Sequence, residues 1–136
     1  MDKIAKLLEE ARKFIEYASE ELDKGLRDRR EEAIRNAAEK AWLAVVKATE
    51  ALLIAKGYGE EEIKTYRQKR LALDSLSVKD PDVRSLGLRD RFGARGYHLH
   101  IRAFYDGEYT PEALREELRK AREMIRDISV LLGVSN

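Results

Sequence analysis

Apolar residues recur every three or four positions along most of this chain, which is the pattern of amphipathic α-helices. The clearest stripe lies near the end of the chain and consists of Leu114, Leu118, Ala121, Ile125, Ile128 and Leu132. Thr110 and Pro111 are the residue types preferred at a helix N-cap and at the first helical position. Gly133 is a typical stop. The sequence therefore predicts a helix over residues 111–132.

The same periodicity predicts a helix over residues 3–24 and another from about residue 28 to residue 57. Gly25 is expected to end the first of these helices. Asp28 and Glu31 have the spacing of a capping box, which is expected to start the second. This second helix is rich in alanine and apolar around much of its surface, so we expect it to be the central helix of the fold.

The middle of the chain has a weaker periodicity. It predicts a helix over residues 60–74, a connection over residues 75–79 and a helical stretch over residues 81–105 that Asp80 caps. Gly93 and Gly96 lie inside this last stretch, and each glycine costs about 1 kcal/mol in a helix interior. A kink or a break is therefore expected near residues 93–96.

Long helices joined by short connections favour antiparallel neighbours. We therefore expect one domain over residues 1–136, an all-α antiparallel bundle of four to five helices. The chain has no cysteine, which excludes disulfides, thiol catalysis and cysteine–zinc sites. It also lacks a signal-type segment and an apolar window of about 18 residues, so we expect a cytoplasmic protein with no membrane association.

Positive charge is concentrated in the middle of the chain, although the net charge of the whole chain is only +1. Residues 63–102 contain ten Lys or Arg against four Asp or Glu, whereas the segments before and after them are net negative. A local basic patch attracts phosphates even on a nearly neutral protein. The alternative is that these side chains only solvate an outer helix face.

Both histidines of the chain lie in this basic segment, where Arg91 and Arg95 precede His98 and His100. Histidine transfers protons near neutral pH, and arginine binds phosphate oxygens. Such a pair can cleave an RNA phosphodiester without a metal or another cofactor. The histidine takes the proton of a ribose 2′-hydroxyl, and the arginine stabilises the charge on the phosphate.

Three neighbouring residues are candidates for holding the nucleic acid: Arg89, Tyr97 and Arg102. Arginine side chains neutralise phosphates, and an exposed tyrosine offers a ring on which a base can stack. Single-stranded RNA, whose bases are free to stack, is the nucleic acid that this combination favours.

The geometry of a helix separates the two Arg/His pairs. Arg91 and His98 are seven residues apart and share one face of a continuous helix. Arg95 and His100 are five apart, roughly 140° around the axis, so they converge only if the backbone breaks near Gly96.

Other readings of the histidines stay open. His100 is spaced with Tyr97 and Phe104 on an apolar face, as a hydrogen-bonded histidine at a helix interface would be, and His98 can be a solvent-exposed residue near Arg102. We expect no metal site, because two histidines two residues apart diverge by about 200° on a helix.

Both Arg91-x6-His98 and Arg95-x4-His100 fit the Arg-x(4–6)-His element of the HEPN superfamily of helical bundles, which this layout of helices resembles. The stretch from Leu99 to Gly107, followed by a final helix that starts with proline, resembles the archaeal PaREP-type branch. The Arg/His pattern is loose, and about twenty residues carry the specific similarity.

The resemblance implies a homodimer and a metal-independent endoribonuclease, often a toxin with an antitoxin-type protein partner. It also implies that Arg95 contacts phosphate and that His100 is the acid or base, with Arg91 and His98 as the second choice. Active members commonly have a polar residue directly after the arginine, where this chain has Gly96 or Phe92. The alternative is therefore a noncatalytic module for dimerisation or nucleotide binding.

Overall fold

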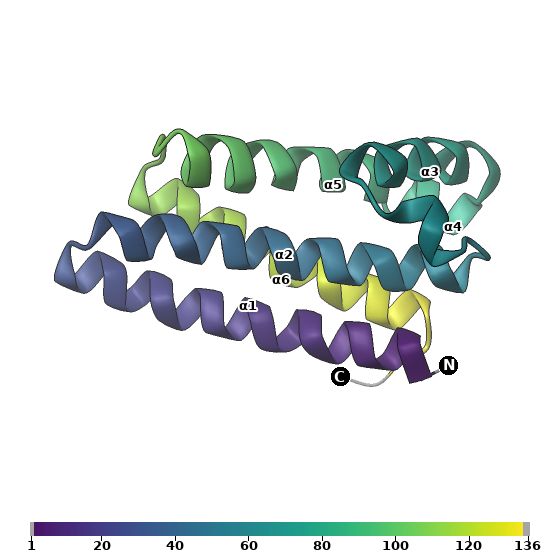
Figure 1. Cartoon of the computed structure of the whole chain (residues 1–136), viewed down its shortest axis with the longest axis horizontal. Coiled ribbons are helices and arrows are strands. Elements are labelled where there is room, and N and C mark those ends of the chain that lie inside the picture. Colours follow the sequence, from purple (N-terminus) through teal and green to yellow (C-terminus); the bar gives the residue numbers. More distant parts are fainter. Residues whose placement is uncertain (1, 135–136) are drawn as a thin grey trace.

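The long helical segments of the chain alternate in direction along the bundle (Figure 1). In the computed structural model, which describes residues 2–134, α1 (Asp2–Asp28) and α2 (Glu31–Ala55) form an antiparallel hairpin. Helix α5 (Leu88–Arg95) continues into η2 (Gly96–Tyr105), and α6 (Pro111–Leu131) returns beside them. The predicted all-α antiparallel bundle is confirmed.

Helix α2 is the central helix, because it contacts α1, α6 and η2. Its alanines are fully buried at six positions along the helix, Ala37, Ala38, Ala41, Ala44, Ala48 and Ala51. Small side chains let the neighbouring helices approach closely on several sides, which is why so much of the α2 surface is apolar. The prediction from the alanine content is therefore confirmed.

Three shorter elements join α2 to α5: the 3₁₀ turn η1 (Glu60–Ile63), α3 (Tyr66–Lys79) and α4 (Pro81–Ser85). The expected connection over residues 75–79 is wrong, because α3 continues to Lys79. The helix is extended by Leu76, whose buried side chain packs in the core. Asp80 caps α4 as predicted, since its Oδ1 accepts from the amides of Asp82 (3.0 Å) and Val83 (3.2 Å).

The expected end of the first helix is also wrong, because α1 runs through Gly25 to Asp28. A Cβ atom at Gly25 would lie 3.0 Å from Cγ1 of Ile34, so this glycine permits the close approach of α1 and α2. The capping box predicted at Asp28 does not form. Arg30 is the N-cap residue of α2 and makes no side-chain cap.

The helical stretch expected over residues 81–105 breaks at Gly87, which has φ +63° between α4 and α5, and not at residues 93–96. At Gly96 the helix continues, but its hydrogen bonding changes from α to π. The amide of Asp106 donates to the carbonyl of Ile101, five residues earlier, at 3.0 Å. Segments of π-helix are rare in proteins overall, but those that occur are often found at functional sites. The η2 segment is therefore a candidate position for a functional site.

Helix length and hydropathy bear on membrane insertion. Within residues 2–134, none of the helices combines the length and the apolar content needed to cross a bilayer.

Candidate functional site

The predicted site residues all lie on the continuous α5–η2 helix. This helix packs against α2 and α3 on one side and against α6 on another. The side chains of the Arg/His element are divided between these sides.

His100 lies on the side of α2, where its Nδ1 is 2.7 Å from Oε1 of Glu39. A carboxylate only accepts hydrogen bonds, so Nδ1 carries the proton and Nε2 of the neutral ring holds the free electron pair. The rings of Trp42, Tyr66 and Tyr105 surround the imidazole, with centroids 6.0, 5.7 and 4.8 Å away. Glu39 therefore fixes a basic nitrogen in an aromatic environment.

The aromatic wall beside His100 depends on Gly96. A Cβ atom at this position would lie 3.1 Å from the buried Trp42 ring, so glycine lets η2 approach α2 closely. Tyr66 completes the wall, and burial raises the pKa of its phenol, as does the negative charge of Glu39. The phenol therefore keeps its proton well above neutral pH.

Arg35 anchors the end of η2 to α2. Its Nε donates to the carbonyl of Phe104 at 2.8 Å, and its Nη2 donates to the carbonyl of Tyr105 at 2.6 Å. Sequence reasoning missed both Arg35 and Glu39. The available signal was their spacing of four residues, which places both charges on one face of an otherwise alanine-rich helix.

Arg95 and Arg91 lie on the side of α6. Nε of Arg95 donates to Oε1 of Glu117 at 2.8 Å, and Arg95 is only 5% exposed. Nη2 of Arg91 lies 2.9 Å from Oδ2 of Asp127, and its Nη1 donates to the carbonyl of Leu86. Both guanidinium groups are thus engaged with carboxylates of α6.

His98 forms an Arg/His contact with Arg102, whose Nη1 lies 3.1 Å from Nδ1 of the ring. A guanidinium only donates, so Nδ1 accepts and the proton of the neutral ring is on Nε2. Arg102 also binds Glu108 at 2.7 Å, which raises the pKa of the guanidinium, and lies over the ring of Tyr97. This group is half-buried to exposed, and solvent reaches it.

The structure therefore assembles neither predicted pair by direct contact. Arg95 binds α6 while His100 binds α2, and Arg91 binds α6 while His98 binds Arg102. The reason is that the backbone does not break at Gly96, so the helix keeps Arg95 and His100 pointed toward different neighbours.

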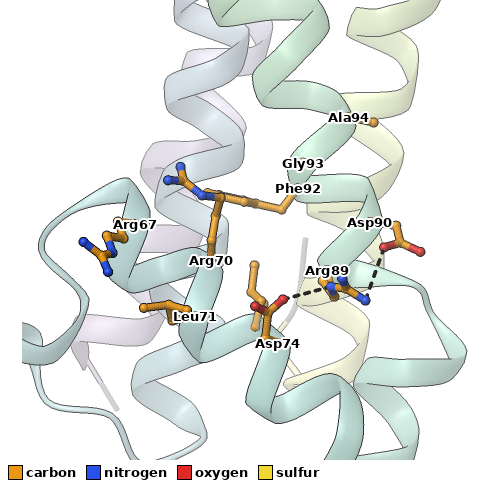
Figure 2. A pocket seen from close by; sticks show the side chains of 10 residues that line it. Arg67, Arg70, Leu71, Asp74, Arg89, Asp90, Phe92, Gly93 and Ala94 are labelled. Atoms are coloured by element: carbon orange, nitrogen blue, oxygen red, sulfur yellow. Dashed lines mark ion pairs between the residues drawn. The ribbon is translucent and has the colours of Figure 1, made fainter.

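Arg89 lies in a separate cleft between α3 and α5, with a volume of about 560 Å³ (Figure 2). It pairs with Asp74 across the cleft at 2.9 Å and approaches Asp90 at 4.0 Å. Arg67 and Arg70 extend from α3 on the other side of the cleft. Within residues 2–134, these two guanidinium groups make no hydrogen bond or ion pair, so the cleft has a positive wall.

The outer surface of η2 carries an apolar stripe with a spacing of four residues. Tyr97, Ile101 and Tyr105 are 53%, 46% and 62% exposed. Large apolar side chains in such a row are uncommon on the surface of a monomeric protein. The stripe runs between His98 and Arg102 on one flank and His100 on the other.

The carboxylates around the histidines do not gather into a metal site. In the part of the chain that the structure describes, no group of three or more His, Cys, Asp or Glu is placed to hold a metal ion.

The chain matches one family model, that of the archaeal PaREP1/PaREP8 family, over residues 6–125. Neither the search of curated proteins nor the search of solved structures found a significant match. The matched region begins in α1 and ends in α6, so it includes most of the bundle and all of the α5–η2 helix. The chain belongs to the archaeal PaREP1/PaREP8 family.

Proposed function

We propose that the protein is an HEPN-like RNA-binding protein that cleaves RNA without a metal ion, with His100 as the proton-transfer group. The observation that supports this role best is the 2.7 Å contact between Glu39 and His100. A carboxylate that holds one ring nitrogen leaves the other free to accept a proton, as in many hydrolytic sites.

In the proposed reaction, Nε2 of His100 takes the proton of a ribose 2′-hydroxyl. The 2′-oxygen attacks the adjacent phosphorus, and the bond to the 5′-oxygen breaks. The leaving 5′-oxygen gains a proton from the imidazolium or from water. The products are a 2′,3′-cyclic phosphate and a 5′-hydroxyl, so no cofactor takes part.

Arg102 and His98 are the proposed phosphate contacts, because both reach solvent and lie together on η2. Arg91 and Arg95 are engaged with Asp127 and Glu117. We assign these two arginines to positioning the helix against α6, and a direct contact with phosphate would require their ion pairs to open.

The proposed path of the RNA uses the exposed aromatic and basic groups on this side of the bundle. Tyr97 offers a ring for base stacking, a contact worth about 1–3 kcal/mol per base. The cleft between α3 and α5 offers the unpaired guanidinium groups of Arg67 and Arg70 to the phosphates. Arg89, which pairs with Asp74, would add a third cation once RNA competes for it.

We also propose that two copies of the chain pair through Ile101 and Tyr105 of this stripe, which leaves the ring of Tyr97 to the RNA. Such pairing would place the histidines of both η2 segments near the same dimer interface. The substitution Ile101→Glu places a charge in the stripe and is expected to give monomers in light scattering after gel filtration. Glu112→Gln, at an exposed position at the start of α6, is the control.

The test of the nuclease proposal is cleavage of labelled RNA in EDTA by the wild type, His100→Ala, Glu39→Gln and His98→Ala. General acid–base catalysis contributes about 10²- to 10⁴-fold, so we expect a loss of that size for His100→Ala. Glu39→Gln should lose less, because an amide still contacts the ring. Glu112→Gln, which removes the same charge at an exposed position on α6, is the matched control for Glu39→Gln.

An inactive wild type, or cleavage that survives His100→Ala, contradicts the nuclease proposal. Fluorescence anisotropy with the same RNA then shows whether the protein binds RNA that it does not cleave. RNA binding without cleavage supports a noncatalytic HEPN-like module, which the buried Arg95–Glu117 pair favours because that arginine is not free for phosphate.

A further inference from the structure

A second basic groove lies between α1 and α6 and has a volume of about 340 Å³. Its lining residues are Arg12, Ile15, Glu16, Arg122, Ile125 and Arg126. Helices α2 and α6 both contact η2 and both contact α1, so they separate this groove from the Arg/His element. What binds here is therefore independent of the proposed RNA site.

The charges of the groove are not balanced. It contains three guanidinium groups and one carboxylate, that of Glu16, which pairs with Arg122. Arg122 also donates to the hydroxyl of Ser19 at 2.7 Å. Within the described residues 2–134, neither Arg12 nor Arg126 makes an ion pair. The groove thus carries two positive charges that no carboxylate of the described chain neutralises.

One of these cations is partly cut off from water. The Nη1 atom of Arg12 is buried and has no hydrogen-bond acceptor within the described residues. A buried donor on a charged group costs free energy when no acceptor meets it. The Arg12 side chain lines the groove, so an acceptor bound there would meet a guanidinium whose hydrogen bonds the described chain leaves partly unsatisfied.

We propose that the α1–α6 groove binds a phosphate group. Its two uncompensated cations match the charge of a phosphate monoester, about −1.5 to −2 near pH 7. Guanidinium groups bind phosphate oxygens through pairs of parallel hydrogen bonds. A single carboxylate carries half that charge and would leave one of the two arginines unmatched. The ligand is either inorganic phosphate or the phosphate of a small organic monoester.

The experiment is titration calorimetry of the full chain at constant ionic strength with inorganic phosphate, AMP, acetate and chloride. We expect phosphate or AMP to bind at least about tenfold more tightly than acetate and chloride, as charge-assisted hydrogen bonds require. Tighter binding of AMP assigns the site to a phosphate monoester. Equal or tighter binding of inorganic phosphate assigns it to the free anion.

The variants Arg12→Met and Arg126→Met test whether this groove holds the phosphate. Each should weaken phosphate binding at least about tenfold, because each removes one charged partner. Arg119→Met is the matched control, since it removes the same charge from α6 but pairs with Glu116 and Glu123 outside the groove. Circular dichroism should show that all three variants are folded.

Arg126 is exposed, so Arg126→Met tests the groove even if Arg12→Met fails to fold. Phosphate binding no tighter than chloride binding would overturn the proposal. So would phosphate affinity that is unchanged in the folded Arg126→Met variant, or reduced equally in Arg119→Met.

Discussion

His98 and His100 are held in opposite tautomers, although only one residue separates them on η2. Nδ1 of His98 accepts from Arg102, whereas Nδ1 of His100 donates to Glu39. Arg102 thus places the proton of the neutral His98 ring on Nε2, whereas Glu39 places that of the neutral His100 ring on Nδ1. Nε2 of the neutral His98 ring can therefore donate a hydrogen bond, whereas Nε2 of the neutral His100 ring can accept a hydrogen bond or a proton.

This difference is measurable by NMR. In long-range ¹H–¹⁵N spectra of the neutral rings, we expect the proton on Nε2 for His98 and on Nδ1 for His100. In Glu39→Leu, the proton of the neutral His100 ring should be shared between Nδ1 and Nε2, while His98 stays unchanged. In Arg102→Met, the proton of His98 should be shared in this way, while His100 stays unchanged. Identical tautomers for the two rings in the wild type would contradict the hydrogen bonds described above.

The contact of Gly96 with Trp42 predicts opposite effects for two alanine substitutions. Gly96→Ala places a Cβ atom 3.1 Å from the buried ring, and such overpacking costs about 1–3 kcal/mol. Gly93→Ala meets nothing within 4 Å on the same helix and should stabilise by about 0.5–1 kcal/mol. Urea unfolding followed by tryptophan fluorescence measures both, and a neutral Gly96→Ala would contradict the close approach of η2 and α2.

The buried pair of Arg95 and Glu117 should matter more for stability than exposed pairs do. Glu117→Leu leaves a guanidinium that is almost fully buried without its carboxylate, which costs about 3–5 kcal/mol. The double substitution Arg95→Met with Glu117→Leu should recover much of this loss, because no unpaired charge remains. For comparison, Glu116→Gln removes one partner of the exposed Arg119 and should cost less than about 1 kcal/mol. Equal losses for the single and double variants would contradict this account.

Asp80 should make the stability depend on acid pH. Its hydrogen bond with Lys56, at 2.7 Å, is the main cause that holds the carboxyl pKa below its ordinary value. The lowered pKa stabilises the fold fully above the ordinary pKa of about 3.9, and this contribution is lost as pH falls through the folded value.

The matched variants for Asp80 separate the charge from the cap. Asp80→Asn keeps a good N-cap residue, so its deficit at pH 7 reports the charge and should shrink as pH falls below about 4. Asp80→Ala also removes the cap of α4 and should cost about 1 kcal/mol more at every pH. A deficit of Asp80→Asn that grows on acidification would contradict the pKa direction.

The sequence was sufficient to predict the class of the fold because the helices satisfy local rules. The stripe from Leu114 to Leu132 and the caps at Thr110 and Asp80 act within one or two helical turns. The end of α1 was mispredicted for the opposite reason. Ile34 on the next helix packs so closely against Gly25 that a larger side chain at residue 25 would clash with it. The sequence around residue 25 does not show such a contact, because Ile34 belongs to a different helix.

The candidate site was predictable only as a segment. The sequence places Arg95, His98 and His100 on one element, but their partners Glu117, Arg102 and Glu39 follow from how the helices pack. The π-helical hydrogen bonding of η2 could not be predicted either, since the spacing of apolar residues does not distinguish α-helical from π-helical hydrogen bonds over so short a segment. Each histidine's chemistry is thus set by a neighbour that periodicity does not identify.

Arg35 connects the candidate site to a residue far away in the chain. Its guanidinium satisfies the carbonyls of Phe104 and Tyr105, 69 and 70 positions later, where the hydrogen-bond ladder of η2 would otherwise end in open carbonyls. The last turn, which holds Tyr105 against His100, is thereby protected from fraying. Deuterium should enter the amides of this turn slowly in the native chain and quickly once the guanidinium is removed, so the imidazole's surroundings would loosen from the helix end inward.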